Sequence, residues 1–421
     1  MDRVPAIRSH TIHKITLDLR YTGTRVNILK SSNPERKAAV RFIVAMGIVS
    51  LFADMTYEGA HSIIGPFLKD LGATAMQVGI VAGLGEMIAA ALRVLSGRLA
   101  DRTRAYWGLT TLGYFLNLVV VPGLAFAGSW KAAALFVVAE RTGKGLRGPA
   151  KDVLLSDATR VVGHGWGFGL HTAMDQTGAV LGPLLIAAIV AREKHFGPAF
   201  LWLIVPAVAA FGSLMFARMM RPNLTSAPSQ TESTSKHLPR VFWFYVASAG
   251  LLAAGFVDFP LLAYHFQKTA IAQPAAIPLY YAGAMAVNGL AALIFGRLFD
   301  RLGMRMLALG IVVSLLALPL GFLGGSTLAI VAVACWAVGL GAQQATLRAG
   351  IAQLIPIEKR GNAYGVFNAA YGVLWFLGSV TMGFLYDHSL IVLVVFGIIL
   401  QLASAAIFFW LQRPLSAAAA E

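Results

Sequence analysis

The chain has few charged residues and a single cysteine. Only 13% of its 421 residues are Asp, Glu, Lys or Arg, about half of the share in soluble globular domains. Hydrophobic residues make up 57%, and the mean hydropathy is +0.70. This composition excludes water as the main solvent of the chain. The lone Cys335 excludes an internal disulfide, and its apolar neighbours indicate a small core residue.

Acidic residues are scarcer than basic ones. The chain holds 19 Asp and Glu against 34 Lys and Arg, and its formal net charge is +15. In a soluble protein this excess would indicate nucleic-acid binding. Here Lys and Arg gather in alternate loops between apolar segments, the pattern that orients membrane proteins. We therefore expect a lipid bilayer, and no nucleic acid, as a partner.

Several motifs of enzymes are missing from the sequence. It contains no Gly-rich phosphate loop of the P-loop type and no nucleophile elbow. We therefore expect no ATP hydrolysis, no enzymatic activity and no cofactor. His61, His171 and His265 stand in three different apolar segments, without the paired His or Cys spacing that metal sites use. We expect no metal site.

Long apolar segments are what the chain has in abundance. A helix of about 20 residues crosses the hydrocarbon layer of a bilayer. Segments of this kind lie at about 39–67, 74–97, 107–128, 131–150, 165–190 and 199–218, and again at about 241–266, 275–296, 304–324, 327–350, 362–386 and 390–411. We predict an all-α membrane protein with twelve transmembrane helices in two pseudo-symmetric six-helix bundles.

The segments divide the chain into five parts. These are a basic tail at 1–37, a first bundle at 38–220, a polar linker at 221–240, a second bundle at 241–412 and a short tail at 413–421. The basic tail either lies on anionic lipid or only helps to set the orientation. The charge pattern of the loops predicts that both termini are cytoplasmic. The size and the simple loops favour a bacterial inner membrane.

A short charged phrase occurs twice. The phrase at positions 97–102 contains Gly97, Arg98, Asp101 and Arg102, and its copy at 296–301 contains Gly296, Arg297, Asp300 and Arg301. Each copy joins two apolar segments, so the copies mark equivalent tight turns in two related halves. Duplicated helical membrane proteins are typically transporters.

These turns, with the twelve segments and the long central loop, resemble the major facilitator superfamily over residues 39–411. The resemblance implies two bundles that work by alternating access. It also implies that Asp101 and Asp300 are latch residues at the cytoplasmic edge, surrounded by the arginines of the two turns. A carboxylate near the positive end of a facing helix gains about 0.3–2 kcal/mol, which is weak enough to release. The alternative is that the arginines only set the orientation.

The fifth apolar segment carries a second resemblance. Its Gly169, Gly178 and Gly182-Pro183 are similar to most of a fifth-helix signature of the family's proton-coupled antiporters. That likeness implies export rather than import. The closing Gly-Gly of the signature is replaced by Ile186 and Ala187. The alternative is that these glycines only allow close helix packing.

The fourth segment contains an arginine motif. Arg141 followed by Gly145 resembles the family's fourth-helix motif, and the denser charged phrase at 140–152 indicates a distinct subgroup.

Ionisable residues occur at membrane depth, mostly in the first half. Each such charge costs about 2.5–3.5 kcal/mol on insertion scales, so it faces a partner or a wet cavity. Asp54, Glu58 and His61 share one helix face, and His171 and Asp175 share another. Our candidates for proton coupling or substrate binding are Asp54, Glu58, His61, Glu86, Glu140, Arg141, His171, Asp175 and Asp258.

Two interpretations of these charges remain open. In the first, Glu58, Asp54 or Asp175 binds a proton from outside and releases it inside, and Arg141 modulates its affinity. In the second, the charges form static pairs at helical spacing, such as Glu86 with Arg93 or Glu140 with Lys144, and only hold the first bundle together.

We predict a secondary transporter that exports a small organic solute in exchange for protons. The alternatives are a proton-coupled symporter that imports a metabolite and a non-transporting membrane receptor or assembly factor. The cavity would lie between the halves, lined by helices one, four, seven and ten, with Gln343 and Gln344 contributing. The expected partners are the solute, protons and lipid, and we expect a monomer.

Overall fold

The computed structural model describes residues 34–221, 238–356 and 360–418. Most of the basic tail, most of the polar linker and the end of the C-terminal tail lie outside these ranges. Every regular element in the described ranges is a helix. This confirms the all-α fold class.

The first half of the chain forms seven α-helices and one short 3₁₀ turn. They are α1 (Pro34–Asp70), α2 (Ala75–Thr103), α3 (Tyr106–Gly123), η1 (Leu124–Phe126), α4 (Trp130–Val162), α5 (His164–Glu193), α6 (Phe196–Trp202) and α7 (Ile204–Met220).

The second half forms eight α-helices. They are α8 (Arg240–Gly255), α9 (Phe259–Lys268), α10 (Ala276–Leu302), α11 (Met304–Leu315), α12 (Ala317–Phe322), α13 (Ser326–Leu354), α14 (Arg360–His388) and α15 (Leu390–Ala418). The pairs α6 and α7, α8 and α9, and α11 and α12 each replace one expected segment.

Eleven stretches of the described chain are long and apolar enough to cross a membrane. The twelfth expected segment is α4, which carries more charge than the others. The fourth segment was expected at 131–150, but the helix runs on to Val162. Membrane helices continue past the hydrocarbon into polar layers, where hydropathy no longer marks them.

The seventh segment is broken near the middle. Phe256 to Asp258 separate α8 from α9, and Pro260 follows at the start of α9. The freed backbone carbonyls have new donors. Gln401 Nε2 lies 2.7 Å from the oxygen of Gly255, and Trp336 Nε1 lies 2.8 Å from that of Val257. Non-helical backbone at membrane depth requires such partners.

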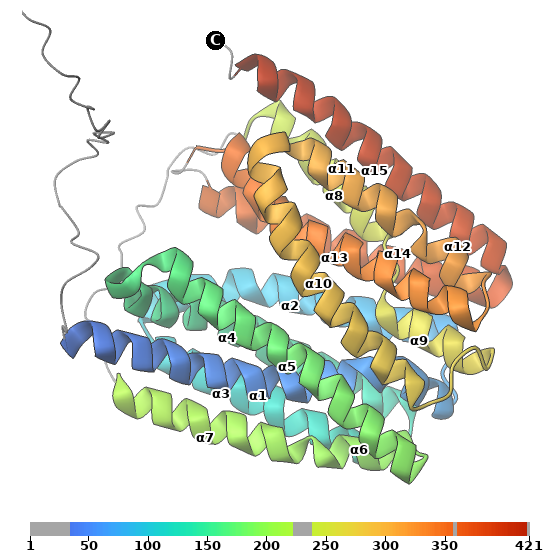
Figure 1. Cartoon of the computed structure of the whole chain (residues 1–421), viewed down its shortest axis with the longest axis horizontal. Coiled ribbons are helices and arrows are strands. Elements are labelled where there is room, and N and C mark those ends of the chain that lie inside the picture. The colour runs from blue at the N-terminus through green and yellow to red at the C-terminus, as the bar shows by residue number, and fades with distance from the viewer. Residues whose placement is uncertain (1–33, 222–237, 357–359, 419–421) are drawn as a thin grey trace, which may run out of the picture.

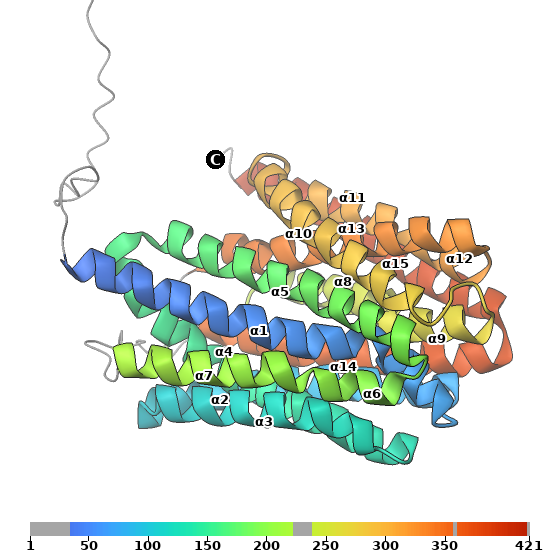
Figure 2. The same cartoon turned by 60° about the horizontal axis from the view of Figure 1, so that its bottom comes forward.

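The helices form two bundles, α1 to α7 below and α8 to α15 above in Figure 1, and the rotated view in Figure 2 shows the same division. The start of α1, the end of α7 and the end of α15 lie at the left end of Figure 1, which we call the linker end. The opposite end, where α1 ends and α2 begins, is the far end.

The hydrophobic cores differ between the two ends. Toward the linker end each bundle has its own core, one built around Phe42 and Tyr114 and the other around Phe242 and Phe408. Toward the far end one continuous core joins both bundles and includes Phe67 and Phe266. The bundles are therefore packed together at the far end and separate toward the linker end.

The bundles contact each other most extensively through α2 with α14, α5 with α10, and α1 with α9. Asp387 of α14 accepts hydrogen bonds from the backbone nitrogens of Ala75 (3.3 Å) and Met76 (3.0 Å) at the start of α2. Gln267 donates to Asp70 at 2.8 Å. In the described residues, the hydrogen bonds that join the bundles lie at the far end and at mid-depth.

Candidate transport site

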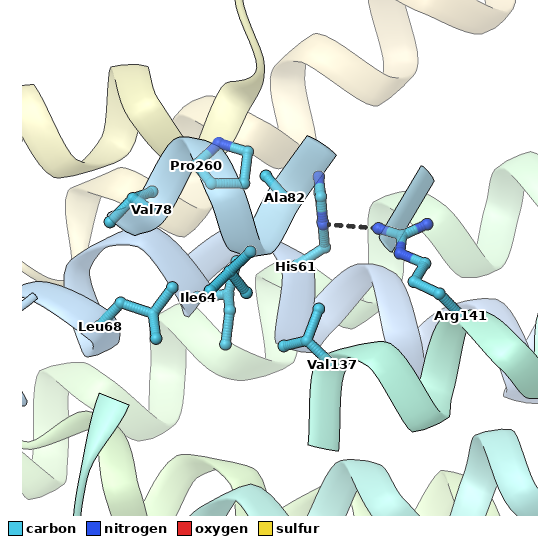
Figure 3. A pocket seen from close by; sticks show the side chains of 9 residues that line it. His61, Ile64, Leu68, Val78, Ala82, Val137, Arg141 and Pro260 are labelled. Atoms are coloured by element: carbon cyan, nitrogen blue, oxygen red, sulfur yellow. Dashed lines mark hydrogen bonds between the residues drawn. The ribbon is translucent and has the colours of Figure 1, made fainter. Parts of the chain in front are cut away.

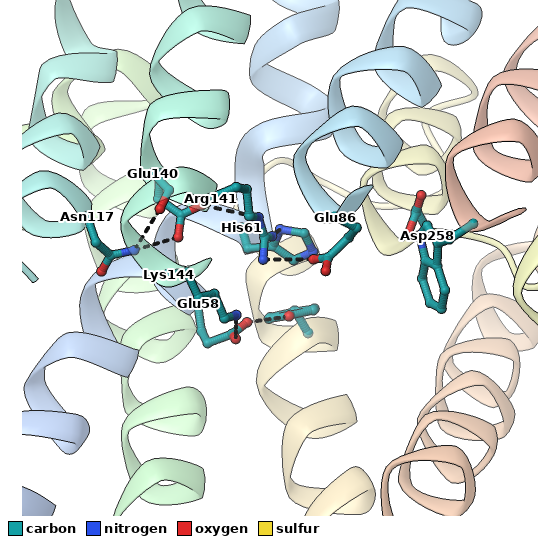
Figure 4. Close-up of polar contacts among 10 residues, drawn as sticks. Glu58, His61, Glu86, Asn117, Glu140, Arg141, Lys144 and Asp258 are labelled. Carbon is teal, nitrogen blue, oxygen red and sulfur yellow. Dashed lines mark hydrogen bonds and ion pairs between the residues drawn. The ribbon is translucent and has the colours of Figure 1, made fainter. Parts of the chain in front are cut away.

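Six of the ionisable side chains gather at mid-depth in the first bundle. We call this group the central cluster; it consists of Glu58 and His61 of α1, Glu86 of α2, and Glu140, Arg141 and Lys144 of α4 (Figure 4). The spacing of these residues places them on helix faces that meet inside the bundle. The cluster therefore contains five of the nine candidates for proton coupling or substrate binding, together with Lys144.

Arg141 lies at the centre of this cluster. Its Nη1 lies 2.8 Å from Glu86 Oε1, and its Nε lies 3.1 Å from Glu140 Oε2. Its Nη2 lies 3.0 Å from His61 Nδ1. Because a guanidinium only donates, His61 accepts at Nδ1 and carries its proton at Nε2. Asn117 of α3 donates to Glu140 Oε1 at 2.7 Å.

Glu58 is held differently from the other carboxylates of the cluster. Lys144 Nζ lies 4.0 Å from its Oε1, at the limit of an ion pair, and the Lys144 nitrogen also lies 4.3 Å from the centre of the Tyr57 ring. Its Oε2 accepts a hydrogen bond of 2.6 Å from Tyr281 of α10, in the other bundle. Glu58 thus contacts both bundles.

A second group lies nearer the linker end. Its hydrogen-bonded members are Ser50, His171 and Asp175: Ser50 Oγ lies 2.9 Å from His171 Nε2, and His171 Nδ1 lies 3.3 Å from Asp175 Oδ2. We call it the linker-side group. Asp54 is buried beside it, and a Cβ on Gly178 would lie 3.0 Å from that of Asp54.

Asp258 lies apart from the central cluster, at the break between α8 and α9 (Figure 4). Its carboxylate accepts hydrogen bonds from Trp375 Nε1, at 2.7 Å, and from Ser379. The three side chains belong to the second bundle, so the structure does not place Asp258 in the central cluster.

The pairs expected from helical spacing are not the ones that form. We considered Glu86 with Arg93 and Glu140 with Lys144, but both carboxylates pair with Arg141, and Lys144 faces Glu58. Helical spacing overlooks partners on neighbouring helices, and Arg141 of α4 reaches α2 across the bundle.

The latch residues lie at the linker end. Arg98, Asp101 and Arg102 are exposed near the end of α2, and Arg297 and Arg301 are exposed near the end of α10. Their glycines Gly97 and Gly296 are half-buried, and the side chain of Asp300 lies outside the described residues. Between described residues, no ion pair of Asp101 is formed in this arrangement. The latch stays a prediction.

The fifth-helix signature divides into packed and open positions. A Cβ on Gly178 would meet the backbone of Leu51, and one on Gly182 would meet the backbone of Met55, both in α1. A Cβ on Gly169 would meet nothing within 4 Å. The helix continues through Pro183 to Glu193. Gly178 and Gly182 therefore allow α1 and α5 to approach closely.

The three histidines that the sequence raised as metal ligands have separate partners. His61 pairs with Arg141, His171 with Ser50 and Asp175, and His265 Nδ1 lies 2.9 Å from the Tyr386 hydroxyl. Within the ranges that the structure describes, no group of three or more His, Cys, Asp or Glu is arranged to hold a metal.

A small pocket lies between the central cluster and the far end (Figure 3). Its cavity volume is about 10 Å³, and it is lined by His61, Ile64, Leu68, Val78, Val81, Ala82, Val137, Arg141 and Pro260. Pro260 belongs to the second bundle and the other residues to the first. The shape of the pocket therefore depends on how the bundles meet.

Sequence reasoning missed the partners that complete these groups. Neither Tyr281 nor Asn117 was a candidate from the sequence. Lys144 was considered only as a partner of Glu140, although it follows Arg141 by three residues on one helix face, as Arg147 follows Lys144. Gln343 is buried and accepts a hydrogen bond of 2.9 Å from Tyr371, whereas Gln344 is exposed.

Comparisons with known proteins agree with this architecture. The chain matches the model of the Major Facilitator Superfamily over residues 46–379 and 244–421. It is 40% identical to an uncharacterised protein of Mycobacterium tuberculosis over 387 residues, 90% of this chain and 94% of that protein. It is 24% identical over 400 residues to an uncharacterised MFS-type transporter of Methanocaldococcus jannaschii, covering 91% and 98% of the two chains.

Solved structures share the fold at low sequence identity. A variant of the nucleoside transporter NupG aligns with a TM-score of 0.72 and 12% identity, over 87% of this chain and all of that one. A bacterial homologue of the human lysosomal transporter Spinster aligns with a TM-score of 0.64 and 14% identity, over 91% and 98% of the two chains. With its helical bundles and this family match, the chain belongs to the major facilitator superfamily and is a transporter of some solute by alternating access.

Proposed function

We propose that this transporter exports a small organic solute in exchange for protons. The charge pattern predicts that the linker end is cytoplasmic, so the arrangement with a joined far end is inward-facing. The proposal places the protein in a bacterial inner membrane. In this state a solute enters between the bundles from the cytoplasm.

The observation that supports the proposal is that the carboxylates of the central cluster differ in how closely they contact cationic side chains. Glu140 and Glu86 each contact Arg141 within 3.1 Å, and Asn117 also binds Glu140. Among the described residues, Glu58 forms an ion pair only with Lys144, at 4.0 Å, and its side chain is 17% exposed. Protonation of Glu58 therefore breaks a weaker ion pair than protonation of either glutamate bound to Arg141 would break. We propose Glu58 as the main proton carrier.

Asp175 is the second carrier that we propose. Its side chain is 29% exposed, and one of its partners in the linker-side group is His171, itself a titratable residue. A proton that reaches Asp175 from the cavity has a continuous route through His171 to Ser50 and the interior of the first bundle.

Purified protein in proteoliposomes tests the proposal. The lumen holds a pH-sensitive dye, and a panel of solutes is loaded inside. An outward gradient of a transported solute should acidify the lumen of wild-type vesicles, because protons enter as solute leaves. Glu58→Gln should lose most of this signal, and Asp175→Asn part of it. Asp152→Asn is the matched control, because Asp152 is an exposed carboxylate on α4 outside both groups.

Full coupling in both Glu58→Gln and Asp175→Asn would contradict the proposal. No flux of any solute in wild-type vesicles would instead favour the receptor or assembly factor.

Proton symport is a second candidate, because the antiporter signature is incomplete. Ile186 is fully buried and Ala187 is 5% exposed where the signature has its closing glycines, and Gly169 packs against nothing. The same vesicles separate the two directions. A symporter would make the lumen alkaline, because protons would leave together with the solute.

A further inference from the structure

Tyr281 belongs to the second bundle but contacts the central cluster of the first. Its hydroxyl donates to Glu58 Oε2 at 2.6 Å, and its ring lies 5.7 Å from that of His61, centre to centre. The ring is held from behind by Phe259 at 4.5 Å and Trp336 at 6.3 Å. Only 3% of the residue is exposed, so its position is fixed by packing.

The contact between Tyr281 and Glu58 depends on the charge of the carboxylate. A carboxylate accepts hydrogen bonds, and a bond from a hydroxyl to a charged oxygen is about twice as strong as a neutral one. A proton on Glu58 removes the charge, weakens the bond from Tyr281 and leaves Lys144 without that counter-charge. The strength of a contact between the bundles thus changes with one proton.

We propose that Tyr281 is the positioning residue that couples the protonation of Glu58 to the movement of the bundles. The inference rests on the proposed role of Glu58. With Glu58 charged, the bond holds α10 against α1 in the present arrangement. With Glu58 protonated, that arrangement loses stability relative to one with the far end open. By linkage, separating Tyr281 from Glu58 changes the affinity of Glu58 for a proton by the same factor.

Other groups face Glu58, but they move with it. They are Asp54, Tyr57 and His61 on α1 and Arg141 and Lys144 on α4. All belong to the first bundle. Rocking of rigid bundles leaves the distances between these groups and Glu58 nearly unchanged, but it alters the distance between Tyr281 and Glu58. The contact with Tyr281 therefore makes the proton affinity of Glu58 depend on the arrangement of the bundles.

The test measures the arrangement directly as pH changes. Spin labels are placed at Arg192 and Gln273, which are exposed at the far end in different bundles, with Cys335 replaced by Ser. Distances are measured by pulsed electron resonance in lipid nanodiscs between about pH 5 and 8. In the parent protein, acidification should increase the population with a long far-end distance.

Tyr281→Phe keeps the ring and removes only the hydroxyl. We expect the change in the ratio of the two arrangements across the pH range to be about tenfold smaller than in the parent. A tenfold change corresponds to the free energy of about one hydrogen bond to a charged group. Tyr280→Phe is the matched control. Tyr280 is its neighbour on α10, is half-buried, packs against Phe266 and should keep the parent's pH response.

A double-mutant comparison keeps the result interpretable if Tyr281→Phe shifts the population at all pH values. Glu58→Gln should also flatten the pH response, and the double variant should be no flatter than either single one. A parent-like titration of Tyr281→Phe, or additive effects in the double variant, would overturn the inference.

The two proposals fail in different ways. If Glu58→Gln titrates like the parent, Glu58 is not the proton site and the proposed carrier is wrong. If Glu58→Gln is flat while Tyr281→Phe titrates like the parent, the carrier stands and only the role of Tyr281 is wrong.

Discussion

Single residues of the central cluster differ in how far their side chains are exposed. Glu140 and Arg141 have side chains that are 9% and 8% exposed, and their charges contact each other. Glu86, Lys144 and Glu58 are 36%, 22% and 17% exposed. Of the two alternatives from the sequence, static pairing describes Glu140 with Arg141, and proton exchange stays a proposal for Glu58.

The buried pair predicts a large loss of stability when it is broken. Glu140→Ala should lower the free energy of unfolding by about 3–5 kcal/mol, because it leaves Arg141 with one carboxylate fewer and removes the shorter of the two hydrogen bonds that Asn117 donates to residue 140. Thermal unfolding in detergent measures the effect. Asp152→Ala, at an exposed site on the same helix, should change stability little. Equal melting of both variants would contradict the structural role of Glu140.

At the scale of helices, α1 and α5 depend on two glycines for their close approach. The fifth-helix signature predicted close packing as one interpretation, and Gly178 and Gly182 meet that expectation against the backbone of α1.

The signature glycines should differ in their tolerance of one methyl group. Gly178→Ala should destabilise the protein and reduce transport, because the new Cβ meets the backbone of Leu51, which cannot give way as a side chain can. Gly169→Ala should have little effect on folding, since its Cβ meets open space. Yield after size-exclusion chromatography and melting temperature compare the two. Greater damage at Gly169 would show that its role is not packing.

The break between α8 and α9 depends on a distant amide. Gln401 of α15 donates to the Gly255 carbonyl and accepts from Ser314 at 2.7 Å. Gln401→Leu should therefore cost about 1–3 kcal/mol for the groups left unsatisfied. Gln353→Leu is the control, because Gln353 is exposed on α13. Guanidinium or thermal unfolding measures both, and an unchanged stability of Gln401→Leu would mean that the break has another support.

For the whole molecule, the far end is where the present arrangement is stabilised. The Asp387 carboxylate at the start of α2 binds two backbone nitrogens of the other bundle. Such a cap interacts favourably with the helix dipole as well as with the free N–H groups. The equivalent contacts at the linker end, expected from the repeated turns, are not formed between described residues in this arrangement.

Removal of this cap should shift the balance between arrangements. Asp387→Ala should raise the population with an open far end several-fold, measured with the labels at Arg192 and Gln273. His388→Ala is the control, because His388 is exposed and bonds within its own helix, to Phe384. No shift in Asp387→Ala would mean that apolar packing alone closes the far end.

The sequence was sufficient for the parts of the fold that follow from hydropathy and repetition. Apolar length gave the spans, and the repeated turn at 97–102 and 296–301 gave the duplication. It was insufficient for the helix break at Asp258, because a run of apolar residues reads the same whether or not the helix is interrupted. It was also insufficient for pairs such as Glu86 with Arg141, which depend on how helices cross rather than on spacing along one of them.

The central claim is that two bundles rock about a proton-binding site at mid-depth. The most direct measurement combines two label pairs in the same protein background, Arg192 with Gln273 at the far end and Arg104 with Leu302 at the linker end, which are all exposed. On acidification, the far-end distance should lengthen while the linker-end distance shortens, and Glu58→Gln should abolish both changes. Two distances that lengthen together, or that do not respond to pH, would contradict the account.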